Sequence, residues 1–103
     1  MRTMIRFNFP VDPGNDLIRS GKVGKVVEQL MADLKPEAAY FYPEDGARGG
    51  IMVFDMPDAS GVAGVVERLS FGLHAKVEVM PVMNADDLQK GLAGIEDIVK
   101  NYA

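Results

Sequence analysis

A pattern of eight residues occurs twice in this chain and constrains its fold more than any other feature. Residues 23–30 and 62–69 both carry valine at the first, fourth and fifth positions, glutamate at the sixth and leucine at the eighth. This spacing places the valines and the leucine on one face of an α-helix. Each copy is followed, after a short turn, by a segment with strand character. The chain is therefore predicted to contain two similar helix–strand halves.

Four segments are predicted to be β-strands. The first, residues 3–9, alternates between two sets of side chains and ends at Pro10. The segment from Pro43 to Gly50 is predicted to be a loop, with a turn at Asp45-Gly46. The other three strands are expected at residues 38–42, 51–55 and 75–82.

Three helices are expected between and after these strands. The first runs from about residue 16 to Pro36, with a separate turn near residues 17–20 as the alternative. The second begins after an N-cap at Ser60 and ends near residue 71, because Gly72 is placed to terminate it. The third follows an N-cap at Asn84, with Asp87 at its third position. Its apolar stripe consists of Leu88, Leu92, Ile95, Val99 and Tyr102.

This order of elements predicts an α+β fold. Two βαβ halves related by a pseudo-twofold axis make the ferredoxin-like βαββαβ arrangement, an antiparallel sheet in strand order 4-1-3-2 with both main helices on one face. The length of 103 residues suits one domain. Residues 1–103 are therefore expected to form a single ferredoxin-like α+β domain with an added C-terminal helix.

The sheet face opposite the helices is predicted to be unusually apolar. A face left to water would carry mostly charged and hydroxyl side chains, and an apolar one usually marks an interface. We therefore expect a homodimer formed through this face. By alternation its residues are Met4, Arg6, Asn8, Tyr40, Tyr42, Glu78, Met80 and Val82, with Met52 and Phe54 or their neighbours.

With this element order and this second face, the chain resembles the dimeric α/β-barrel superfamily, in which two ferredoxin-like subunits pack sheet against sheet. Residues 35–41, 45–50 and 81–88 resemble segments of a small uncharacterised bacterial family within that superfamily. The superfamily includes isomerases and cofactor-free monooxygenases. The resemblance implies a homodimer that needs no cofactor, and it assigns no catalytic residue.

Few residues are chemically capable, and each allows two interpretations. His74, the only histidine, is either a residue of the turn after the second helix or a general base. Tyr40 and Tyr42 are interface aromatics or proton donors. Arg6 and Glu78 form a cross-strand ion pair or, with Asn8, bind an anionic ligand.

Two further motifs have plain structural explanations. The Arg48-Gly49-Gly50 segment is either an anion-binding loop or a flexible hairpin tip. Asp86 and Asp87 are explained by the positive end of the last helix, so no metal site is predicted.

Composition excludes several classes of protein. The chain has no cysteine, so disulfides and thiolate chemistry are excluded, and a reducing, cytoplasmic location is expected. The net charge is −4 with scattered basic residues, which argues against a nucleic-acid partner. No apolar run reaches the roughly 20 residues of a membrane helix, and the N-terminus lacks the pattern of a signal peptide.

Two function classes remain. The first is a small homodimeric binding or interaction protein, with a small molecule as its ligand. The alternative is a cofactor-free enzyme, isomerase-like or monooxygenase-like, that acts on a small aromatic or acidic molecule with His74 and a tyrosine as acid or base. A cavity of ligand size reached by His74, Arg6 or a tyrosine would favour the enzyme.

Overall fold

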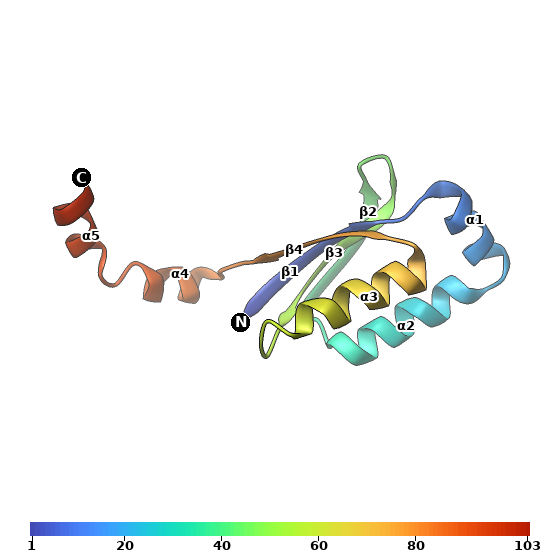
Figure 1. Cartoon of the computed structure of the whole chain (residues 1–103), viewed down its shortest axis with the longest axis horizontal. Helices are drawn as coiled ribbons and strands as arrows, with labels where there is room; N and C mark the ends of the chain where they lie inside the picture. Colours follow the sequence, from blue (N-terminus) through green and yellow to red (C-terminus); the bar gives the residue numbers. More distant parts are fainter.

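The computed structural model describes residues 1–103 and shows one four-stranded antiparallel sheet with helices packed on one of its faces (Figure 1). The elements are β1 (Arg2–Asn8), α1 (Val11–Arg19), α2 (Lys22–Leu34), β2 (Ala38–Glu44), β3 (Ala47–Asp55), α3 (Gly61–Leu73), β4 (Lys76–Pro81), α4 (Ala85–Gly91) and α5 (Ile95–Tyr102).

The strand order is β2-β3-β1-β4, and all three pairings are antiparallel. This confirms the predicted order 4-1-3-2. It places β1 in the interior of the sheet, where Arg6 pairs with Ile51 on one side and with Glu78 on the other. The α+β class is confirmed with it.

The predicted loop at residues 43–50 is wrong, because most of it is strand. Strands β2 and β3 continue to a two-residue turn at Asp45-Gly46, where φ is 52° and 76° respectively. Positive φ at both central residues is the geometry of a type I′ turn, whose twist matches that of the flanking strands. The glycines that suggested a loop, Gly49 and Gly50, instead pair within β3.

The predicted first helix is two helices. Helix α1 begins at Val11 and includes Pro13, which is tolerated in a first turn because its missing N–H would have no intrahelical partner. Gly21, with φ of 73°, separates α1 from α2. The predicted end of the second helix at Gly72 is also wrong, since α3 continues to Leu73 and ends at His74, whose φ is 56°.

The core lies between the sheet and the two helices that carry the repeated pattern. Helices α2 and α3 lie side by side on one face (Figure 1), and their matching leucines, Leu30 and Leu69, are buried. Met52 and Phe54 are buried on this helix-covered face, so their placement on the opposite face is corrected. The alternative prediction, that their neighbours lie on the opposite face, holds for Ile51 and Val53. The remaining core residues are Ile5, Phe7, Phe9, Met56, Val65 and Leu73.

The chain after β4 forms an arm, residues 83–103, that extends away from the sheet (Figure 1). The predicted capping box is confirmed, with Asn84 and Asp87 bonded in both directions. The predicted single helix is two short helices, and neither α4 nor α5 has a buried residue. The radius of gyration is 17.0 Å, against about 13 Å for a compact domain of this length. No helix of the fold has the length and apolar character needed to cross a membrane.

Candidate ligand-binding cavity

The polar side chains on the sheet face opposite the helices bond to groups of the same protein chain. This face is called the open face. The Arg6 guanidinium lies 2.9 Å from the Glu78 carboxylate and 3.4 Å from that of Glu44. The Asn8 amide donates a hydrogen bond of 3.0 Å to the Glu44 carbonyl oxygen. The predicted cross-strand ion pair is thus present, and the two carboxylates raise the pKa of Arg6, mainly through the hydrogen bond from Arg6 to Glu78.

These polar groups leave little room for a ligand. The hollow beside Arg6, Asn8 and Glu78 has a volume of about 90 Å³, which accommodates a few water molecules at roughly 30 Å³ each. The Arg6 charge is already matched by two carboxylates. The structure therefore brings the predicted ligand-binding residues together with their charges paired inside the protein, although Nε of Arg6 has no hydrogen-bond acceptor.

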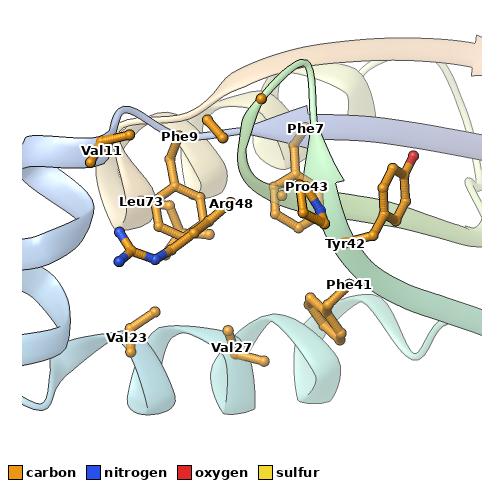
Figure 2. Close-up of a pocket in the computed structure, with 13 residues that line it drawn as sticks. Phe7, Phe9, Val11, Val23, Val27, Phe41, Tyr42, Pro43, Arg48 and Leu73 are labelled. Atoms are coloured by element: carbon orange, nitrogen blue, oxygen red, sulfur yellow. The ribbon is translucent and has the colours of Figure 1, made fainter.

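The two candidate tyrosines lie on edge strand β2. Tyr40 is 64% exposed and Tyr42 is 38% exposed. Hydrogen bonding to the Glu44 carboxylate raises the pKa of the Tyr42 phenol above its usual value, so this phenol is protonated at neutral pH. Its ring points away from the space enclosed by the other labelled side chains in Figure 2.

His74 lies elsewhere. It is the C-cap of α3, and it lines a separate hollow together with residues of α1, the α1–α2 connection and the start of α2. It shares no hollow with Arg6, Tyr40 or Tyr42. The predicted catalytic candidates are therefore not assembled around one common space.

A larger cavity opens on the helix-covered side of the sheet, between α2 and the β2–β3 hairpin. Figure 2 shows it, and its volume is about 540 Å³. We call it the hairpin cavity. Nine of its thirteen lining residues are hydrophobic, so its walls favour an apolar occupant. The thirteen lining residues are Phe7, Phe9, Val11, Val23, Val27, Phe41, Tyr42, Pro43, Gly46, Ala47, Arg48, Gly49 and Leu73.

The local sequence explains why the space is not filled. On the helix-facing side of β3, Gly50 sits between Phe7 of β1 and Phe41 of β2. Since Gly50 has no side chain, the two rings approach edge to face, with centroids 6.5 Å apart. Towards the hairpin end, Gly46 and Ala47 add at most a methyl group. Phe41 stays 53% exposed on this side, so the hairpin and α2 do not close on each other.

One charged side chain, Arg48, reaches this apolar space. Its backbone is held beside β1, because its carbonyl oxygen accepts a 3.0 Å hydrogen bond from the Phe9 amide. Its guanidinium extends over the cavity towards α1 (Figure 2) and donates a 2.9 Å hydrogen bond to the Asn15 amide oxygen. Arg48 therefore belongs to a strand, and neither an anion-binding loop nor a hairpin tip describes it.

Gly14 of α1 makes room for this guanidinium. Gly14 is buried, and a Cβ atom there would lie 2.9 Å from Nη1 of Arg48 and 3.0 Å from the Phe9 ring. Any larger residue would displace Arg48 or Phe9. The close approach places a fixed positive charge against one wall of the hairpin cavity.

The sequence did not predict this cavity, because its candidate ligand-binding residues lie on the opposite face of the sheet. Periodicity predicted which residues face the helices, but it gives no measure of how fully the helices cover them. The available signal was local: Phe41, Gly50 and Arg48 alternate onto the helix side of an edge hairpin, where a helix cannot cover the whole strand.

The fold and the hairpin cavity define a small α+β protein with an apolar, arginine-bearing pocket beside its sheet. Known proteins do not narrow this class, because no family model matches the chain and a comparison with curated proteins finds no match. No cluster of three or more histidine, aspartate or glutamate side chains is arranged to hold a metal ion.

Proposed function

We propose that this protein is a homodimeric small-molecule-binding protein whose ligand occupies the hairpin cavity of each subunit. The observation that carries the proposal is the cavity itself. Its volume of about 540 Å³ lies within the range of roughly 300–1,000 Å³ for ligand pockets, which are typically apolar with a few placed polar groups. The ligand expected here is small and mainly apolar.

The proposed architecture is ferredoxin-like, within the dimeric α/β-barrel superfamily. The sheet order and the two helices on one face support the first part. Support for the dimer comes from the open face, where Tyr40 pairs with Ile51 and the neighbouring row of the sheet holds Val53, Met4 and Met80. The exposed apolar residues of the arm, including Leu88 and Ile98, add surface that a second subunit would cover.

Catalysis, the alternative function, gains little support from the site. The cavity is large enough to hold a small ligand, and Tyr42 is one of its lining residues. The Tyr42 phenol, however, points away from it (Figure 2), and the pKa of this phenol is raised. His74 lies at another hollow. A binding function requires only the shape and apolar lining of the cavity.

Binding is tested by NMR with 2-naphthol, a neutral aromatic probe. We expect saturable amide shift changes concentrated on Val23, Val27 and Phe41. Replacing Val27 with phenylalanine should narrow the cavity and reduce them, whereas Val62→Phe, at an exposed site on α3, should leave them unchanged. Shift changes confined to the open face, or none at millimolar probe, would refute the proposal.

A further inference from the structure

Arg48 is the arginine whose charge the protein leaves unmatched. Arg2, Arg6, Arg19 and Arg68 each lie within salt-bridge distance of at least one carboxylate. Arg48 has none, and its one side-chain hydrogen bond goes to the neutral amide oxygen of Asn15. Its other N–H groups have no protein acceptor.

From this charge and its surroundings we propose that the hairpin cavity selects a small carboxylate with an apolar body, whose anionic head binds Arg48. This deepens the proposed function, on which it rests, by naming the class of ligand. A guanidinium presents paired N–H donors that match the two oxygens of a carboxylate.

The surroundings of Arg48 suit an anion in two ways. None of the thirteen residues that line the cavity is acidic. Arg48 is exposed, and its one side-chain hydrogen bond, to the Asn15 amide oxygen, holds the guanidinium over the cavity and leaves its other N–H groups available to an anion.

The remaining lining fixes the other end of the ligand. Val23 and Val27 of α2 face Phe41 of β2 across the cavity (Figure 2). Aromatic and branched side chains on opposite walls suit a flat ring or a short alkyl chain. A carboxylate held at Arg48 would direct its apolar body between these walls.

The test compares 2-naphthoate with its neutral analogue 2-naphthamide by calorimetry and NMR on the intact protein. In the wild type we expect naphthoate to bind at least about tenfold more tightly, as a charge-assisted hydrogen bond provides. Arg48→Met should bring this ratio close to one, and Arg48→Lys should retain part of it. Arg68→Met, at a residue of α3 that pairs with Asp33 and does not line the cavity, should leave the ratio unchanged.

The outcomes separate this inference from the function on which it rests. Equal binding of both compounds, or a naphthoate preference that survives in Arg48→Met, overturns the inference and leaves a neutral apolar pocket. Absence of binding by either compound overturns both. If Arg48→Met does not fold, Arg48→Lys decides. The inference would then be contradicted by a naphthoate-to-naphthamide affinity ratio equal to that of the wild type, with amide shift changes away from Asn15.

Discussion

At the scale of single residues, Gly49 and Gly50 are fixed by the close approach of neighbouring strands. A Cβ atom on Gly49 would lie 2.0 Å from the Phe7 carbonyl oxygen, and one on Gly50 would lie 2.1 Å from that of Tyr40. Both contacts are with backbone, which cannot move without breaking the β1–β3 or β2–β3 ladder. These positions therefore require glycine for packing in the sheet, independently of any ligand.

The first prediction concerns this requirement. Gly49→Ala should destabilise the protein by roughly 2–4 kcal/mol, the range of severe steric substitutions, as measured by urea unfolding. Gly24→Ala is the matched control, because Gly24 lies in helix α2 with open space around its Cβ position. It should stabilise by about 0.5–1 kcal/mol. An unfolding free energy for Gly49→Ala within about 0.5 kcal/mol of wild type would contradict the sheet geometry.

The second prediction concerns the titration of Tyr42. Hydrogen bonding to the Glu44 carboxylate favours the neutral phenol and raises its pKa above the usual value of 10.0. Glu44→Gln removes the negative charge, so the Tyr42 pKa should fall. Absorbance titration in a background with Tyr40→Phe and Tyr102→Phe isolates this phenol. Asp45→Asn, in the adjacent turn, is the charge-matched control. A Tyr42 pKa that falls equally in both variants would contradict the assigned cause.

Sequence alone predicted some of these residue roles. The Arg6–Glu78 pair followed from alternation on two adjacent strands, because register fixes which side chains face each other. The role of Arg48 could not follow, since it depends on the separation of α1 from the hairpin and on the absence of a side chain at Gly14. Such distances arise from packing, which periodicity does not encode.

At the scale of elements, two helices end on a residue whose backbone is left-handed although the residue is not glycine. Lys35 closes α2 with φ of 46°, and His74 closes α3 with φ of 56°. This conformation costs an ordinary residue roughly 1–2 kcal/mol, and glycine is the usual residue there. His74 is therefore explained as the C-cap of a helix.

The third prediction is that His74→Gly stabilises the protein. Relief of the left-handed strain exceeds the extra chain entropy that glycine brings to the unfolded state, for a net gain of about 0.5–1 kcal/mol in the free energy of unfolding. His74→Ala is the control, because it removes the imidazole but keeps the strain, and it should give no gain. Equal stabilisation by both substitutions would show that the imidazole, and not the backbone, is responsible.

Element types were predictable and their ends were not. The repeated valine–leucine pattern predicted α2 and α3, alternation predicted β1, and strands were also predicted in the regions of β2, β3 and β4. The errors lie at glycines: Gly72 is interior to α3, and Gly49 and Gly50 are interior to β3. A glycine is compatible with a helix end, a loop or a close contact, and only the surrounding packing decides which role it takes.

At the scale of the whole molecule, the open face and the arm leave apolar side chains in water. Tyr40 on the sheet and Leu92, Ile98 and Val99 on the arm are between 48% and 64% exposed. The arm extends beyond the sheet along the 59 Å long axis (Figure 1). It therefore cannot cover the open face of its own chain without bending near Met83. A twofold-related second copy would place apolar surface against both.

The last prediction is a dimer through the open face. Apolar burial contributes roughly 25 cal/mol per Å², and a stable specific interface buries about 1,200 Å² or more in total. Arg6 pairs with Glu78 and Glu44, and Asn8 donates to the Glu44 carbonyl oxygen, so covering this face leaves few polar groups without partners. Sedimentation at roughly micromolar protein should give twice the 11.2 kDa chain mass.

Substitutions locate the interface. Tyr40→Asp should weaken the dimer at least about a hundredfold, because a buried unpaired charge costs roughly 3 kcal/mol. Arg6→Leu should also weaken it, because Glu44 and Glu78 would keep their charges on the covered face without a cation. Phe71→Asp is the matched control: Phe71 is 82% exposed on α3, away from the open face, so the same new charge should leave the mass unchanged. A wild-type protein that sediments only as an 11.2 kDa monomer would exclude the dimer, and an equal loss in Tyr40→Asp and Phe71→Asp would place the contact elsewhere.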